Sequence, residues 1–150
     1  MVTGNESINV KKRNGRGLEK LDIDKIHSMV EYAVEDITGV SASQIEMNSG
    51  LQFYDGMTTE EIQQILIKSA ADLINLNTPN YTYVASRLLL YSLRKQIFHK
   101  LWDHPHFFDH VKKTVELGMY DEEILKNYER KDFDRMENWI NHERDYTFTY

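Results

Sequence analysis

The sequence predicts a mainly α-helical protein in which a core of four helices lies under a short β-hairpin lid, followed by a short helical extension. Three observations lead to this prediction. Three stretches between residues 24 and 99 carry apolar side chains at helical spacing, and a fourth begins with a capping box. A short alternating stretch with a glycine-containing turn precedes them. The pair His104-Pro105 then separates them from three shorter amphipathic stretches.

The predicted hairpin covers residues 8–23. Ile8 and Val10 alternate with polar residues, which is typical of a half-buried strand. Residues 14–17, Asn-Gly-Arg-Gly, tolerate the positive φ angles that a tight turn needs. The apolar residues assigned to the return strand are Leu18, Leu21 and Ile23.

The first core helix is predicted from its apolar spacing and the second from its capping box. The first begins near Asp24, and Gly39 is its expected stop. Ser41 and Gln44 have the spacing of a capping box for a short second helix. The apolar face of the first helix consists of Ile26, Met29, Val30, Ala33, Val34 and Ile37. The second helix carries Ile45 and Met47.

The third and fourth core helices have the clearest pattern. Thr58 and Glu61 form a predicted capping box for the third helix, and residues 77–79, Asn-Thr-Pro, are its expected end. The fourth runs from about Asn80 to about His99 and is apolar over much of its circumference. It is therefore the expected central helix.

Three shorter helices are expected in the extension, at about 105–117, 121–128 and 132–142, and Gly118 is the expected end of the first. Residues 146–150 alternate aromatic and polar side chains, which indicates a strand or a turn. The predicted organisation is a flexible N-terminus over 1–7, a main domain over 8–100 and a helical segment over 101–150.

Composition excludes several classes of protein. Without cysteine the chain has no disulfide, thiolate nucleophile, cysteine-type zinc site or redox pair. Its first residues are polar and its longest apolar run is only residues 88–91, so we expect a cytoplasmic protein that is neither secreted nor membrane-spanning. A net charge of -6 disfavours general nucleic-acid binding.

Positive charge is concentrated at the hairpin. Residues 11–20 hold five basic side chains and one acidic one. A lid carrying Lys12 and Arg13, with Lys25 opening the next helix, suits a polyphosphate. A solvated basic patch fits the same residues, and no Gly-x-x-x-x-Gly-Lys loop occurs.

The histidines His104, His106 and His110 form a cluster in sequence, but no His-Glu-x-x-His pattern accompanies them. We therefore predict a surface or interdomain cluster and no metal site. No spacing indicates a catalytic Ser/His/Asp set, so no catalytic residue is predicted either.

Several segments occur in an order that resembles a known module. Residues 10–15 (Val-Lys-Lys-Arg-Asn-Gly) and 21–26 (Leu-Asp-Ile-Asp-Lys-Ile) open the match. It continues through residues 52–59, 67–74, 79–88 and 93–95. Together they resemble the ATP-cone, the allosteric nucleotide-binding domain at the N-terminus of many ribonucleotide reductase large subunits.

Four segments of the extension are similar to the class I aerobic large subunit: residues 108–111, 118–121, 142–145 and 148–150. In that family this stretch leads from the cone into the reductase barrel domain. The resemblance thus implies a fragment of a longer chain, either cut from it deliberately or the product of a split gene.

The resemblance also implies a set of site residues. Phosphate contacts are expected from Lys12, Arg13, Lys25 and Lys95. Contacts with base and ribose are expected from Glu19 and the segment after it, which includes Leu21 and Asp22. Apolar walls are expected from Ile26 and Tyr91, and a phosphate contact from the Thr59 hydroxyl.

Two departures from the family pattern stand out. The hairpin is about one residue longer than in the bacterial members that it resembles. Gln63 stands one turn after Thr59, where bacterial members often carry a histidine that helps to distinguish nucleotides. Glutamine forms hydrogen bonds but cannot be cationic. We therefore hypothesise weakened or altered inhibition by dATP.

The implied function is the on/off regulation of ribonucleoside diphosphate reduction, with Mg²⁺-bound ATP as activator and dATP as inhibitor. The expected partners are the rest of the large subunit and the radical-generating small subunit, in an enzyme that oligomerises. The required catalytic cysteines are absent, so this segment would be regulatory. The alternatives are a degenerate cone that binds no nucleotide and serves in structure or subunit contacts, and a free-standing regulator. The familiar regulator needs a zinc ribbon, which the absence of cysteine excludes.

Overall fold

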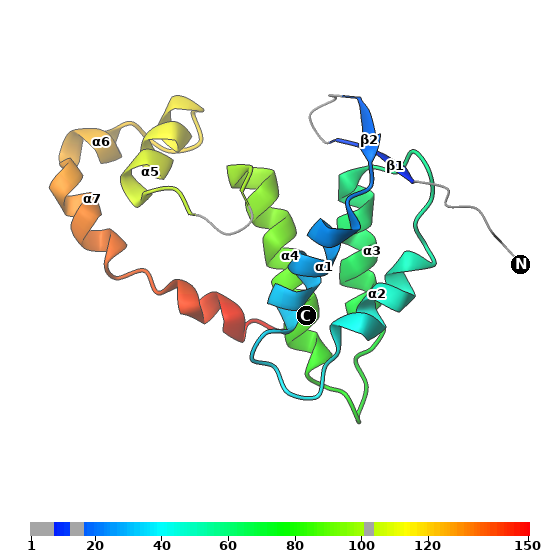
Figure 1. Ribbon diagram of the computed structural model, residues 1–150. Helices are drawn as coiled ribbons and strands as arrows, with labels where there is room; N and C mark the ends of the chain where they lie inside the picture. The colour runs from blue at the N-terminus through cyan, green and yellow to red at the C-terminus, as the bar shows by residue number, and fades with distance from the viewer. Residues whose placement is uncertain (1–7, 13–16, 101–103) are drawn as a thin grey trace, which may run out of the picture. The chain divides into compact units, whose positions relative to one another are not determined.

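The computed structural model describes residues 8–12, 17–100 and 104–150, and it confirms the predicted fold class (Figure 1). In these residues a two-stranded antiparallel sheet precedes a series of helices. The strands are β1 (Asn9–Lys11) and β2 (Leu18–Lys20). The helices are α1 (Ile23–Val34), α2 (Ala42–Gly50), α3 (Thr59–Ala71), α4 (Tyr81–Phe98), α5 (Phe107–Glu116), α6 (Glu123–Asn127), α7 (Arg130–Glu137) and the 3-10 helix η1 (His142–Thr147).

The chain divides into two compact units. One runs to Leu93 and also includes Asp145–Tyr150, and the other covers Arg94–Arg144. The first unit holds the hairpin, α1, α2, α3 and most of α4. The helices in the described part of the chain all lack the combination of length and apolarity that crossing a membrane requires.

The predicted hairpin is confirmed, and it is bonded to the loop before α3. Val10 lies opposite Glu19 in the sheet and is buried. The free edge of β1 continues the pairing, since the Lys11 amide donates to the Met57 carbonyl and the Gly56 amide donates to the Asn9 carbonyl, both at 2.8 Å. Two strands of three residues are too short to be stable alone, so this second edge supports the hairpin.

The return strand is shorter than predicted. Ile23 belongs to α1 and is 70% exposed, so its assignment to the strand is wrong. The reason is a local cap: the Asp22 side chain accepts a hydrogen bond from the Lys25 amide at 3.2 Å and begins the helix there. The predicted flexible N-terminus and the predicted turn over residues 14–16 lie outside the described residues, and Gly17 has the positive φ expected of it.

Helix α1 buries the predicted face through Met29, Val30 and Ala33, but it ends at Val34 rather than at Gly39. Asp36 reverses the chain first, with a φ of 60°. Aspartate is one of the few residues with a side chain that enter this left-handed region, so a glycine was not needed to end the helix.

The predicted capping box of α2 is wrong. The Ser41 side chain makes no capping bond. Instead the buried Tyr81 hydroxyl accepts a hydrogen bond from the Ser41 amide at 2.9 Å and donates one to the Gln44 Oε1 at 2.6 Å. A side chain from α4 therefore replaces the local cap. In α2, Ile45 is buried and Met47 is exposed.

The capping box of α3 is confirmed. The Glu61 amide donates to the Thr58 Oγ1 at 3.1 Å, and the Thr58 amide donates to the Glu61 Oε2 at 2.6 Å. The helix ends at Ala71, before the predicted stop at 77–79. Side chains of Asn75 and Thr78 bond to nearby main-chain groups in the connection, which favours a turn over further helix.

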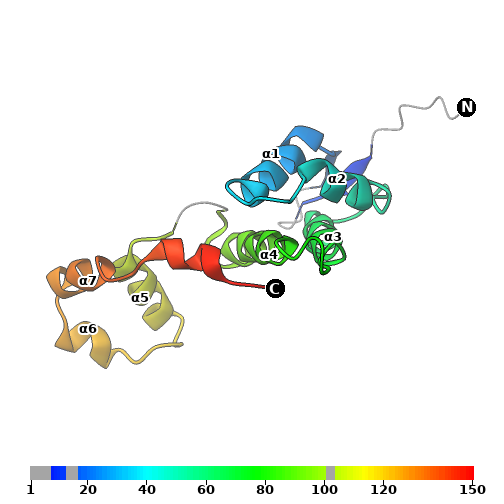
Figure 2. The same cartoon turned by 90° about the horizontal axis from the view of Figure 1, so that it is seen from below.

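Helix α4 reaches each of the other core helices through one polar side chain. Tyr81 bonds to the start of α2, as described above. Arg87 donates to the Ala33 and Glu35 carbonyls at the end of α1. Ser92 donates to the Gln63 Oε1 of α3 at 3.3 Å. Figures 1 and 2 show α1 and α2 side by side.

The second unit packs α5 against α7 around Phe133. The rings of Phe107 and Phe108 lie 5.8 and 5.4 Å from the Phe133 ring. Helix α7 ends at Glu137, so Trp139 and Ile140 follow it and are exposed. Residues 146–150 were expected to form a strand or a turn, and η1 occupies His142–Thr147, so no strand forms up to Thr147.

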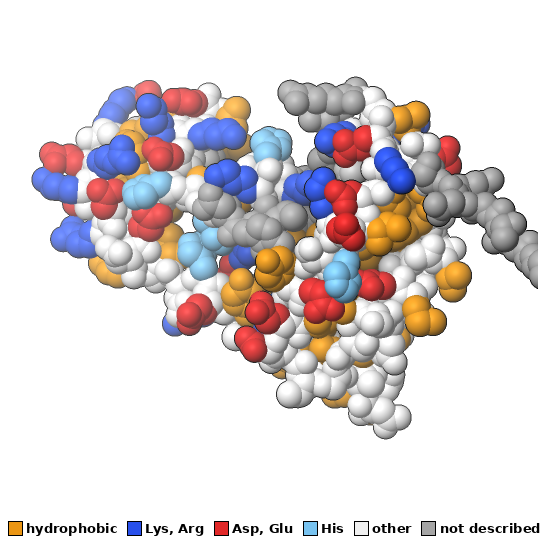
Figure 3. All heavy atoms as spheres, in the orientation of Figure 1, with side chains coloured by type: hydrophobic (Ala, Val, Ile, Leu, Met, Phe, Trp, Pro, Cys, Tyr) orange, Lys and Arg blue, Asp and Glu red, His pale blue; other side chains and the backbone are white. Residues whose placement is uncertain are grey.

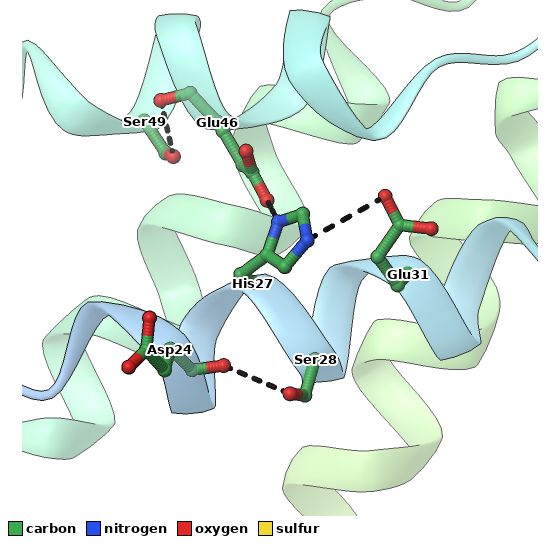
Figure 4. A network of polar contacts seen from close by, with 6 residues as sticks. All are labelled: Asp24, His27, Ser28, Glu31, Glu46 and Ser49. Atoms are coloured by element: carbon green, nitrogen blue, oxygen red, sulfur yellow. Dashed lines mark hydrogen bonds and ion pairs between the residues drawn. The ribbon is translucent and has the colours of Figure 1, made fainter.

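A polar network joins α1 to α2 (Figure 4). The His27 Nδ1 lies 2.7 Å from the Glu46 Oε1, and its Nε2 lies 3.9 Å from the Glu31 Oε1. The hydrogen bond to Glu46 raises the pKa of His27 above its ordinary 6.5, with smaller contributions from the charges of Glu46, Glu31 and Asp24. The fold therefore favours protonated His27.

The two helix starts allow a direct comparison of caps. We expect Thr58→Ala to lower the free energy of unfolding by about 1 kcal/mol, because a side-chain cap of α3 is lost. Ser41→Ala should change it much less, since the Ser41 side chain caps nothing. Urea unfolding followed by far-UV circular dichroism measures both. Equal losses for the two variants would contradict this account of α2 and α3.

The His27–Glu46 pair should make stability depend on pH. Because the folded pKa is raised, the contribution of the pair is complete below pH 6.5 and is lost as pH rises through the folded pKa. Glu46→Gln should therefore lower Tm at about pH 5.5 and have little effect at about pH 9. Glu31→Gln is the control and should have a smaller effect, since its carboxylate lies farther from the ring. A pH-independent loss for Glu46→Gln would contradict the pairing.

Candidate functional site

Two ion pairs lie on the hairpin and at the start of α1. The Lys12 Nζ is 2.7 Å from the Glu19 Oε2, across the hairpin. The Lys25 Nζ is 2.9 Å from the Asp22 Oδ2, and Lys25 is largely exposed. Figure 3 shows basic and acidic side chains next to each other beside the hairpin. The positive charge predicted here is thus partly balanced by neighbouring carboxylates.

Asp22 has two functions in this arrangement. One carboxylate oxygen caps α1, and the other pairs with Lys25. Its pKa is lowered by the hydrogen bonds from the Lys25 side chain and amide, and the pKa of Lys25 is raised by the hydrogen bond to Asp22. Both groups are therefore charged at neutral pH. Leu21 and Ile26, on either side of this pair in the sequence, are half-buried.

The N-terminus of α3 lies beside the hairpin. Lys11 forms an isolated parallel β-bridge with Thr58, the residue that caps α3. Thr59 is the first residue of the helix and is half-buried. This pairing places the strand that leads to Lys12 next to a helix N-terminus. Such a terminus favours negative charge, because its amides and its dipole point outward.

Glu61 already supplies one negative charge at this end of α3. Hydrogen bonds from the Thr58 amide and hydroxyl lower its pKa, so it is ionised. The Tyr54 hydroxyl donates to its other oxygen at 3.2 Å, which raises the pKa of Tyr54. The composition of the loop alone did not indicate this Tyr54–Glu61 contact. The spacing of Thr58 and Glu61 indicated only the capping box, which is one of the two contacts of Glu61.

Two predicted residues are buried between α3 and α4. Gln63 is 5% exposed and accepts a hydrogen bond from Ser92, the residue after Tyr91. Tyr91 is also buried. Sequence analysis missed Ser92, and only the tertiary contact identifies it. Lys95 follows Tyr91 by one turn of α4 and is half-buried.

The structure therefore groups most of the predicted site residues on neighbouring elements. Hairpin and α1 residues are contiguous, and the bridge to Thr58 joins them to the start of α3. Asp55, which sequence analysis also missed, strengthens this junction by accepting hydrogen bonds from the amide and side chain of Asn9. Arg13 lies outside the described residues.

The three clustered histidines make ring contacts and an ion pair in the second unit, and His104 and His110 share one partner, Phe98. His106 pairs with Glu137 at 2.5 Å. His110 lies edge-on to Phe98, with ring centroids 5.6 Å apart. His104 stacks on His142 at 3.8 Å. All of these contacts lie within the second unit.

Comparison with known proteins shows close relatives along nearly the whole chain. It is 44% identical over 146 residues to "Ribonucleoside-diphosphate reductase 1 subunit alpha" of Salmonella typhimurium, and 42% identical over 146 residues to the Escherichia coli protein of the same name. Each match covers 97% of this chain and 19% of the relative. A subunit alpha from Buchnera aphidicola of Acyrthosiphon pisum is 47% identical over 141 residues, which are 94% of this chain and 18% of the relative.

The chain thus spans about a fifth of the length of the curated relatives that it matches. A family comparison gives the more direct assignment, because it concerns the domain itself. The ATP cone domain matches residues 8–96, which begin just before β1 and end within α4. The chain belongs to the ATP-cone domain family.

Proposed function

We propose that this chain binds ATP and dATP, with Mg²⁺, and that it regulates a ribonucleoside-diphosphate reductase of which it forms a part. The observation that carries the proposal is the bonding of β1 to the loop before α3. It brings Lys11, and with it the chain that leads to Lys12, against the capped start of a helix. Cationic side chains and helix amides together are a suitable environment for phosphate.

The two lysines of these ion pairs can exchange a carboxylate partner for a phosphate. Lys12 and Lys25 are held by carboxylates, but these pairs are substantially exposed and contribute little to stability. A triphosphate offers more charge and more acceptor oxygens than Glu19 or Asp22 does. Each lysine can therefore turn from its carboxylate to a phosphate at small cost, and Mg²⁺ would offset part of the remaining negative charge.

The other assigned residues complete the proposed site. Arg13 and Lys95 would add phosphate contacts. Leu21 and Ile26 would contact the nucleotide through apolar surface, as would Tyr91. Glu19 and Asp22, once released from their lysines, would accept hydrogen bonds from base or ribose. Thr59 would donate its hydroxyl to a phosphate, and Gln63 would contribute neutral hydrogen bonding.

The regulated reaction would be the reduction of ribonucleoside diphosphates to deoxyribonucleotides. The names of the relatives support this assignment. The 150 residues hold no cysteine, so thiol chemistry has to occur elsewhere in such an enzyme. ATP would activate and dATP would inhibit, by changing contacts with the rest of the large subunit and with the small subunit.

One observation favours a second candidate, a degenerate cone that acts only in subunit contacts. Two lysines of the proposed site, Lys12 and Lys25, already have acidic partners within 3 Å. If those pairs were permanent, the site would offer little net positive charge to a phosphate. Nucleotide titration separates the two candidates directly.

Calorimetric titration with ATP and with dATP, in the presence of Mg²⁺, tests the proposed site. We expect Lys25→Ala to weaken binding roughly tenfold, because a charged phosphate contact is lost. Lys12→Ala should have a similar effect. The matched control is Lys68→Ala, which breaks an exposed lysine–aspartate pair of the same length, 2.9 Å, on α3. It should leave binding unchanged.

Two results would count against the proposal. Absence of heat with either nucleotide would support the degenerate cone. Equal weakening by Lys68→Ala and Lys25→Ala would show that general electrostatics, and not this site, hold the nucleotide. Lys95→Ala tests the further phosphate contact that the family resemblance implies.

Gln63 should weaken discrimination between the two nucleotides. Its buried amide bonds to Ser92 and carries no charge, so we expect ATP and dATP to bind the chain within about fivefold of each other. Gln63→His should change that ratio, whereas Gln64→His, on the exposed face of the same helix, should not. Strong selectivity for dATP that is abolished by Gln63→Ala would overturn this expectation.

A further inference from the structure

The segment Asp145–Tyr150, here called the strap, packs with the first compact unit. The Tyr150 amide donates to the Thr82 carbonyl and hydroxyl, at 3.2 and 3.0 Å. The Thr82 hydroxyl donates in turn to the Tyr150 carbonyl at 3.1 Å. The strap is therefore bonded to the first turn of α4 by main-chain groups as well as by side chains.

Arg87 lies between the strap and the end of α1. Its Nη1 donates to the Glu35 carbonyl at 2.6 Å and to the Ala33 carbonyl at 3.3 Å. Its Cζ lies 5.0 Å from the centre of the Tyr146 ring, in cation–π contact. A cation at a helix C-terminus is favourable, because the last carbonyls point toward it. One side chain thus holds both α1 and the strap.

The two ends of α1 have different partners. The first turn carries Lys25, and the last carbonyls are held by Arg87. A helix of 12 residues is about 18 Å long, and its main-chain hydrogen bonds connect one end to the other. A shift of α1 caused by a ligand at Lys25 therefore changes the geometry at Arg87.

The surroundings of Arg87 leave room for such a change. A shallow depression of about 390 Å³ is lined by Asp36, Tyr83, Arg87 and Tyr146, among others. The buried Nε of Arg87 has no hydrogen-bond partner, so one donor of the guanidinium is left unsatisfied. The chain after α1 is fixed separately, since the Asn80 side chain donates to the Thr38 carbonyl at 2.8 Å.

We propose that Arg87 is a latch that couples the docking of the strap to nucleotide binding at the start of α1. The proposal rests on the proposed function. A docked strap holds Arg87 on the α1 carbonyls and so preorganises the helix for its ligand. By reciprocity, bound nucleotide holds the strap in place by the same factor. Arg87 is in this sense a positioning residue, distant from the nucleotide.

Hydrogen exchange measured by mass spectrometry tests the latch in the unaltered chain. We expect ATP with Mg²⁺ to slow amide exchange in residues 145–150 about fivefold or more. Arg87→Lys should abolish this protection and weaken ATP binding by a similar factor, because an ammonium cannot serve both carbonyls and the ring. Arg130→Lys is the matched control, since Arg130 makes a cation–π contact of 5.2 Å with Phe108 in the second unit.

Tyr146→Leu provides a second variant in case Arg87→Lys fails to fold. It removes the aromatic face but leaves the α1 carbonyls bonded, so the strap should exchange faster and ATP should bind more weakly. Tyr120→Leu, at another exposed tyrosine, is its control.

The outcomes separate the two proposals. Intact ATP binding with unchanged exchange in the strap would overturn the latch and leave the proposed function standing. Failure of the unaltered chain to bind either nucleotide would overturn the proposed function and the coupling with it. Loss of protection in Arg87→Lys and Tyr146→Leu alone, with both controls unchanged, is the result that supports the latch.

Discussion

The arrangement of the first unit depends on the main-chain bonds between β1 and the loop before α3. A hairpin of two three-residue strands has little stability of its own. The bonds from Lys11 to Met57 and from Gly56 to Asn9 supply a second partner edge. They also place the basic strand beside a helix start. Support of the lid and formation of the candidate site therefore rely on the same bonds.

Helix α4 organises the remaining core by polar contacts made from a largely apolar surface. Tyr81, Arg87 and Ser92 each bond to a different helix, at positions spread along α4. A buried polar group without a partner is costly, so each contact disfavours other packings of these helices. Apolar burial drives the helices together, and these bonds select how α1, α2 and α3 meet α4.

Local signals predicted the parts of the fold that local chemistry controls. The capping box at Thr58 and Glu61 was predicted correctly because both partners lie within one turn. The same reasoning failed at Ser41, where Tyr81, 40 residues away, takes the capping role. It failed again at Gly39, because Asp36 reversed the chain first. In both cases a competing residue satisfied the helix end before the predicted one could.

In the candidate site, too, some features could be predicted from the sequence and others could not. Composition, spacing and motif order were enough to predict the residue types near the hairpin, the helical faces, and the family to which the segments belong. Three features became visible only in the folded chain: Lys12 and Lys25 are paired with carboxylates, Gln63 bonds to Ser92, and Arg87 contacts both α1 and the strap. Such contacts depend on distances across the fold, which periodicity along the chain does not specify.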